Sequence, residues 1–177
     1  MMNDPDDYRT PQYVLDWISQ YICEITHDGA CNELMLSRSG IWSPEPNSVA
    51  TPIDICSLEL DLIKPMHVFI NPPWDTPTIL KLVHRAAYLN MVDDTMTFTF
   101  LLPNKLCNKA WVEQVYPHLQ QIIFLGGRIN FEGPNAAPAA KSRHGCFLGI
   151  IDGLANKQIE AITVKKMKQQ VRDNVGR

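Results

Sequence analysis

The fold is decided by the stretch from Val68 to Trp74, VFINPPW, in which three apolar residues typical of a buried strand run straight into a rigid turn. A strand that ends at Asn71 presents its side-chain amide at the carboxyl end of a sheet, where open α/β folds bind ligands. Each proline fixes φ and lacks an N–H, so the Asn71 and Pro72 carbonyls are held as acceptors at little entropic cost. With the flat face of Trp74, this pattern suits a planar base that carries an exocyclic amine. The alternative is a rigid strand-to-helix turn with a buried Trp.

Composition indicates one ordinary globular domain over residues 1–177, with a core at about 7–152 and a basic helical tail at 153–177. The net charge of −3 means that a nucleic-acid partner would have to meet a local positive patch. The acidic amino terminus is not a signal peptide, and no segment approaches membrane-spanning length. Five cysteines without a CxxC spacing favour reduced thiols, so we expect a cytoplasmic protein with no membrane partner.

Strand-like and helical segments alternate along the chain, which predicts a three-layer α/β sheet. We expect Thr10 to cap the first helix, with Pro11 at its first position, and Thr76-Pro77 to cap a second helix that ends near Asn90. The sequence of residues 36–52 predicts a loop. Predicted strands cover residues 23–26, 53–56, 96–102, 121–125 and 146–151, and a further helix is expected around 110–119.

The tetrapeptide Asn71-Pro72-Pro73-Trp74 resembles the catalytic motif of amino-methyltransferases, which use S-adenosyl-L-methionine to methylate exocyclic or amide nitrogens. A Gly-Arg-x-x-Phe strand at 127–131 and a small-residue and proline-rich loop at 133–140 follow later in the chain. Together with Arg9-Thr10-Pro11 and Leu102-Pro103-Asn104, these motifs resemble the bacteriophage Dam-type DNA adenine methyltransferases over roughly residues 7–152.

The resemblance implies a three-layer, Rossmann-like methyltransferase fold with a mostly parallel central sheet. It implies methyl transfer from S-adenosyl-L-methionine to N6 of an adenine flipped out of DNA. The catalytic residues would be Asn71, Pro72, Pro73 and Trp74. The cofactor would be held by Tyr8, Thr10, Pro11, Asp28, Ala30 and Asp54. DNA phosphates would be met by Lys105, Arg128, Lys141 and Arg143.

Other interpretations stay open for several of these features. Thr10 and Pro11 also serve as an ordinary helix start, Asp54 also suits a turn, and the basic tail also suits a solvated helix face. The central motif occurs in enzymes that methylate RNA bases or protein glutamines. Only Gly29 stands where methyltransferases usually have two or three glycines, so a catalytically silent binding module is a third hypothesis. The short chain favours a short recognition site or a homodimer.

Overall fold

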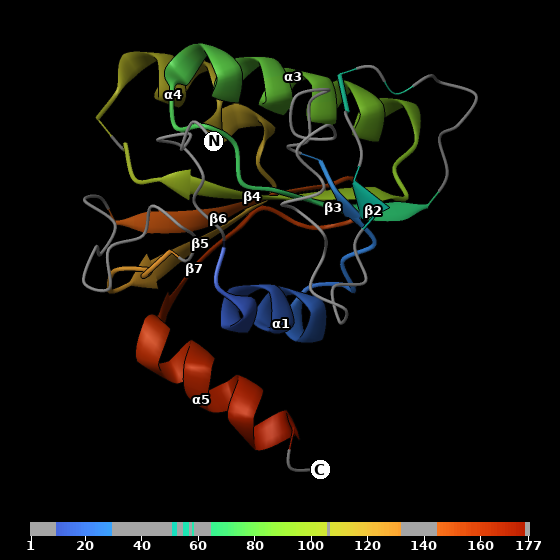
Figure 1. Cartoon of the computed structure of the whole chain (residues 1–177). Coiled ribbons are helices and arrows are strands. Elements are labelled where there is room, and N and C mark those ends of the chain that lie inside the picture. The colour runs from blue at the N-terminus through green and yellow to red at the C-terminus, as the bar shows by residue number, and fades with distance from the viewer. Residues whose placement is uncertain are drawn as a thin grey trace, which may run out of the picture.

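The computed structural model describes residues 10–29, 51–52, 55–56, 58, 65–105, 107–131 and 145–175. These residues form an α/β structure in which one sheet is covered by helices on both faces (Figure 1). The strands are β1 (His27–Asp28), β2 (Thr51–Pro52), β3 (Met66–Ile70), β4 (Met96–Pro103), β5 (Gln121–Gly126), β6 (Cys146–Asp152) and β7 (Gln158–Thr163). The helices are α1 (Gln12–Tyr21), α3 (Thr76–Val92), α4 (Lys109–Gln114), the 3-10 helix η2 (Tyr116–His118) and α5 (Val164–Val175).

The sheet of the described residues has the order β2-β1-β3-β4-β6-β5-β7, and most of its neighbouring strands are parallel, as predicted. Only β6 runs against its neighbours β4 and β5. The chain goes from β1 outward to β2 and then crosses to the other side of β1 to form β3 and β4. The strand order therefore reverses between β1 and β3, and the carboxyl ends of these two strands are where an open α/β sheet binds its ligand.

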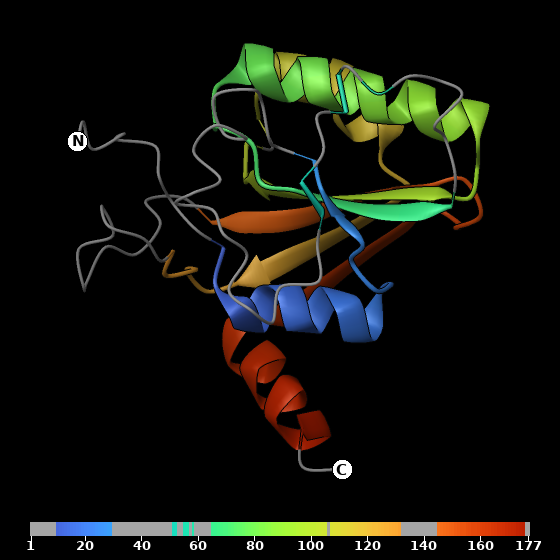
Figure 2. The same cartoon turned by 45° about the vertical axis from the view of Figure 1, so that its right-hand side comes forward.

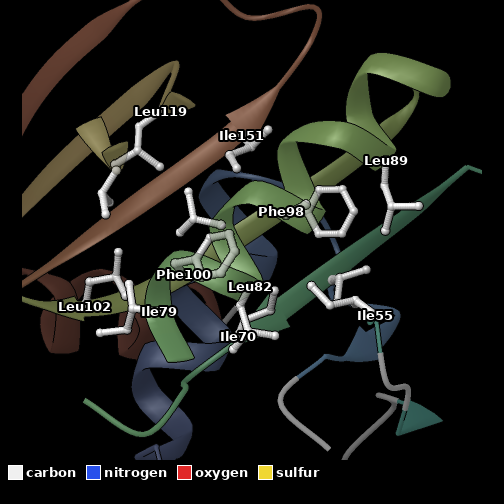
Figure 3. Close-up of a cluster of buried hydrophobic side chains, with 14 of the residues drawn as sticks. Ile55, Ile70, Ile79, Leu82, Leu89, Phe98, Phe100, Leu102, Leu119 and Ile151 are labelled. Carbon is white, nitrogen blue, oxygen red and sulfur yellow. The ribbon is translucent and has the colours of Figure 1, made fainter. Parts of the chain in front are cut away.

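Strand β3 is buried along its whole length because helices cover both faces of the sheet. Val68 and Ile70 belong to a core cluster shared with α3, whose Ile79, Leu82 and Leu89 are drawn in Figure 3. Phe69, between them, belongs to a second cluster on the opposite face, shared with α1 and α5. The alternation along β3 thus divides its side chains between two cores, which fixes the depth and register of the strand.

The N-cap residues of α1 and α3 each lie one position from the predicted caps. In α1 the N-cap is Pro11, which makes no side-chain capping bond, so the prediction of Thr10 as cap is wrong. In α3 the cap is Asp75, whose carboxylate accepts a 2.9 Å hydrogen bond from the Thr78 N–H. Asp75 and not Thr76 is the cap because an N-cap side chain bonds the N–H of the residue three positions later, and that residue is Thr78.

Several predicted strands are displaced or absent. The strand expected at 23–26 is β1 at His27–Asp28, and part of the strand expected at 53–56 is a turn at 55–56 that follows β2. The strand expected at 127–131 is not formed, since Gly127 has a φ of 117° and Asn130 makes only a single bridge. A backbone with positive φ ends β5 there, and glycine tolerates it at no steric cost.

The carboxyl-terminal region differs from the predicted helical tail, because the edge strand β7 precedes α5. Every residue of β7 except Ile162 is exposed, so the strand carries no apolar alternation that a sequence pattern could detect. The helix α5 then packs beside α1 on one face of the sheet (Figures 1 and 2). No helix in the described parts of the chain combines the length and the apolarity that crossing a membrane requires.

Candidate active site

The Asn-Pro-Pro-Trp motif lies just beyond the carboxyl end of β3, next to the end of β1. Ile70 is the last residue of β3 paired with β4, so Asn71 is the first residue past the sheet. On the other side Asp28 pairs with Phe69, and the Gly29 N–H donates a 2.8 Å hydrogen bond to the Phe69 carbonyl. The motif and Asp28 are therefore brought together at the point where the strand order reverses.

Asn71 is half-buried, and its side-chain amide forms no hydrogen bond with any residue that the structure describes. Pro72 behind it is buried, whereas Pro73 is exposed. A partly desolvated amide that the fold does not use retains its capacity to bind a ligand, and desolvation strengthens such a bond. The prediction that Asn71 presents this group at the sheet edge agrees with its position.

Trp74 is half-buried and meets the ring of Phe131 edge-to-face, with 5.5 Å between ring centroids. It packs against the α1 side of the core, together with Tyr13 from the first turn of α1. Its carbonyl accepts a 3.4 Å hydrogen bond from Lys105 Nζ. The indole is therefore held by Phe131 and the core, and the backbone of Trp74 is held by Lys105, which together limit the movement of this residue at the edge of the site.

The amino-terminal end of α1 lies at the same sheet edge as the motif. Beyond the other end of α1, the Cys23 carbonyl bonds His67 Nδ1 at the start of β3, at 2.8 Å. Since α1 runs antiparallel to β3, its first residues return to the carboxyl end of that strand, as Figures 1 and 2 show. Thr10 is half-buried and Pro11 is buried there. The predicted cofactor segment and the motif thus share one edge.

The predicted cofactor residues are only partly described. Asp28 is half-buried at the end of β1, whereas Tyr8, Ala30 and Asp54 lie outside the described residues. The small residue at this strand end has a packing role: a Cβ added to Gly29 would lie 2.5 Å from Val68 Cγ1 and 3.1 Å from Ile55 Cγ2. The glycine therefore lets β1 pack on the core, and the space that its missing side chain leaves is already filled by protein.

The predicted DNA-binding residues divide in the same way. Lys105 is half-buried, and its ammonium lies 5.4 Å from the centroid of the Trp111 ring. The same ammonium donates a hydrogen bond to the Trp74 carbonyl, so it stabilises the motif loop. Arg128 is exposed. Lys141 and Arg143 lie outside the described residues, in the part of the sequence between Phe131 and Gly145. Phe131 contacts Trp74, and the Gly145 carbonyl accepts a 2.7 Å hydrogen bond from the Asn104 N–H.

A small pocket of about 200 Å³ lies at this edge, beyond the ends of β4, β5 and β7. Its lining includes Asn104, Gly126, Gly145 and Thr163. Sites for drug-sized ligands usually measure about 300–1,000 Å³, so this pocket alone does not accommodate a nucleoside cofactor. Asn104 belongs to the predicted motif Leu102-Pro103-Asn104, and Gly145 directly precedes β6.

Two features of the site had weak signals in the sequence. Phe131 was visible only as the last residue of the Gly-Arg-x-x-Phe pattern, and its contact with Trp74 joins residues 57 positions apart. Asp75 was visible as an acid between the motif and a helix. The pKa of Asp75 is lowered, first by the hydrogen bond from the Thr78 N–H and to a smaller extent by the charge of Lys105. This carboxylate therefore stays ionised beside the motif at neutral pH.

No protein-family model matches the chain, and no curated protein matches it. The function must therefore be argued from the arrangement of Asn71, Trp74, Asp28 and the start of α1 at one sheet edge.

Proposed function

We propose that the protein is a methyltransferase that transfers a methyl group from S-adenosyl-L-methionine to N6 of adenine in DNA. The observation that carries the proposal is the position of Asn71: a half-buried amide beyond the end of β3, beside the end of β1, with no hydrogen bond to the described residues. The finer assignment of the sheet to a Rossmann-like methyltransferase fold is part of this proposal. Its support is the reversal of strand order between β1 and β3.

The residues at the edge suit binding of an adenine amine. The Asn71 side-chain carbonyl and the Pro72 backbone carbonyl would accept its two N–H groups, which favours a pyramidal nitrogen with its lone pair directed away from both acceptors. The proline ring fixes the second acceptor in advance. Trp74, braced by Phe131, would stack against the flipped base and replace part of the stacking that the base loses on leaving the duplex.

Two features of this edge suit S-adenosyl-L-methionine. Asp28 places a carboxylate at the end of β1, where it would accept from the amino group or a ribose hydroxyl, and Thr10 and Pro11 lie at the start of α1 on the same edge. When bound, S-adenosyl-L-methionine supplies an electrophilic methyl group, which leaves its sulfur as the bond to N6 forms, and one amine proton passes to water. The protein's contribution is to hold the amine in line with the methyl group, an effect on the order of several kcal/mol.

The test is calorimetry of the protein with S-adenosyl-L-methionine, followed by transfer of a labelled methyl group to duplex DNA, RNA and protein. We expect saturable cofactor binding and label in DNA that is recovered as N6-methyladenine. If label is found only in RNA or protein, the assigned substrate would change, whereas the proposed methyl-transfer chemistry would stand. A protein that binds no cofactor would be a binding module, and the proposal would be wrong.

A further inference from the structure

We infer that the exposed face of α5, together with Arg128, is the surface that binds the phosphate backbone of duplex DNA. This inference rests on the proposed function and names the surface through which its substrate is held. It shares only Arg128 with the surface expected from the sequence, where Lys105, Arg128, Lys141 and Arg143 were to meet the phosphates. In the structure, Lys105 supports the motif loop.

The first observation is how α5 divides its side chains. Met167 and Val171 are buried against the α1 side of the core. Lys165, Lys168 and Arg172 are exposed and follow the spacing i, i+3, i+7, which places them in one stripe away from the buried face. At a rise of 1.5 Å per residue, this stripe extends for roughly 10 Å, a length along which duplex DNA carries about six phosphate charges.

The second observation is that the helix is fixed against the domain. Trp17 Nε1 donates a 3.0 Å hydrogen bond to Gln170 Oε1, and Asn174 Nδ2 donates to Tyr21 Oη at 3.1 Å. The Lys168 ammonium lies 4.4 Å from the centroid of the Tyr13 ring. A helix held at both ends presents its charges in a defined line, so less conformational entropy is lost on binding than with a mobile basic tail.

The third observation is charge separation. Of the chain's 16 basic and 19 acidic residues, α5 carries four basic and one acidic, so 12 basic and 18 acidic residues remain elsewhere. The helix thus has a net charge of +3 and the rest of the chain −6. Its single acid, Asp173, accepts a 2.7 Å hydrogen bond from Gln169, and no described carboxylate pairs with Lys165 or Arg172. An anionic ligand is therefore attracted to α5 more than to the rest of the chain, whose net charge is negative.

The fourth observation connects the stripe to the candidate site. The strand β7 is parallel to β5, so α5 begins at the sheet edge where the motif lies. A Cβ added to Gly127 would lie 3.5 Å from Val164 Cβ, which places exposed Arg128 next to the start of α5. From this edge the helix α5 runs obliquely away below α1 (Figure 2). A duplex lying along it would pass the edge where Asn71 and Trp74 are found.

The experiment measures binding of a fluorescein-labelled 30-base-pair duplex by anisotropy over a range of salt concentrations, without S-adenosyl-L-methionine. The variant is Lys165→Gln with Arg172→Gln, since neither side chain contacts α1 in the structure. The matched control is Lys81→Gln with Lys157→Gln, which removes two exposed lysines from α3 and from the loop before β7. We expect the variant to lower the slope of log affinity against log salt by about 1 to 2, and affinity near 100 mM salt by at least about tenfold. The control should retain the wild-type slope.

The inference would be overturned by a wild-type protein that does not bind the duplex, by a slope unchanged in the variant, or by an equal loss in variant and control. A slope that falls only with a single-stranded RNA probe would assign the stripe to RNA and would also overturn it. Calorimetry with S-adenosyl-L-methionine on the same proteins keeps the two proposals separate. Absence of cofactor binding contradicts the methyltransferase, whereas an unchanged slope contradicts only the α5 surface.

Discussion

At the scale of single residues, the methyltransferase proposal depends most on the Asn71 amide. We expect Asn71→Ala to abolish methyl transfer, because the change removes an acceptor used by the substrate amine. Since the side chain bonds no described residue, the urea midpoint should change little. Cofactor affinity should also be retained by calorimetry. Transfer within a few-fold of wild type would rule out the role given to Asn71.

Trp74 allows a test of stacking against packing. Phe at this position retains a flat face and edge contact with Phe131, whereas Ala removes both. We expect Trp74→Phe to keep most of the transfer activity and Trp74→Ala to lose base binding worth about 1–3 kcal/mol. The measurement is kcat/KM on duplex DNA. Equal losses for both variants would indicate that the indole serves the fold and not the base.

His67 predicts a dependence of stability on pH. Its Nδ1 donates to the Cys23 carbonyl, which can only accept, and its Nε2 bonds the Thr99 hydroxyl, each at 2.8 Å, so Nδ1 carries the proton of the neutral ring. Burial lowers the pKa of His67 below its ordinary 6.5, although backbone hydrogen bonds and the charge of Asp152 oppose this. As pH falls below about 6.5, the unfolded chain therefore gains a proton that the folded chain does not.

The free energy of unfolding should thus decrease on acidification, by at most about 1.4 kcal/mol per pH unit from this residue, until the pKa of the folded state is reached. Urea titrations at pH 7.5, 6.5 and 5.5 on wild type and His67→Gln measure the effect. The pKa of His118 is also lowered, first by burial and then by His84, and this contribution is common to both proteins. Identical pH profiles would show that His67 does not titrate in this range.

At the scale of elements, the residue after β1 has little room for a side chain. We expect Gly29→Ala to lower the free energy of unfolding by about 1–3 kcal/mol, because its Cβ would overlap Val68 and Ile55 in the core. Gly126→Ala is the matched control: its nearest neighbour would be Thr163 Cγ2 at 3.5 Å, and a change below about 1 kcal/mol is expected. Chemical denaturation measures both free energies of unfolding. Equal decreases for Gly29→Ala and Gly126→Ala would mean that β1 can move away from β3.

The long elements were predictable and the short ones were not. β4, β5 and β6 lie where their apolar runs place them, since buried strands of six to eight residues leave a clear signal. β1 and β2 have two residues each, so pairing with strands distant in sequence decides their position. β7 was missed because all of its residues except the half-buried Ile162 are exposed, and the strand expected at 127–131 fails because one glycine adopts a positive φ.

At the scale of the whole molecule, the sequence predicted which edge of the sheet carries the motif but not what surrounds it. That Asn71 follows a strand is a local fact, visible in the apolar run before it. The contact between Trp74 and Phe131, the return of α1 to the same edge and the docking of α5 on α1 all join segments far apart in the chain. Such contacts depend on strand order, which no local pattern encodes.

The antiparallel strand β6 has a consequence for the order in which the chain folds. It lies between β4 and β5 and is paired with both, yet it is made after either of them, at residues 146–152. During synthesis, β4 and β5 therefore emerge with no bond between them, each with an open edge. Loop closure over these distances slows folding, and unpaired edges invite association with other chains. Before β6 is made, β2, β1, β3 and β4 can therefore pair, whereas β5 has no partner, because both of its neighbours, β6 and β7, come later in the chain. The central sheet closes only when β6 has been synthesised.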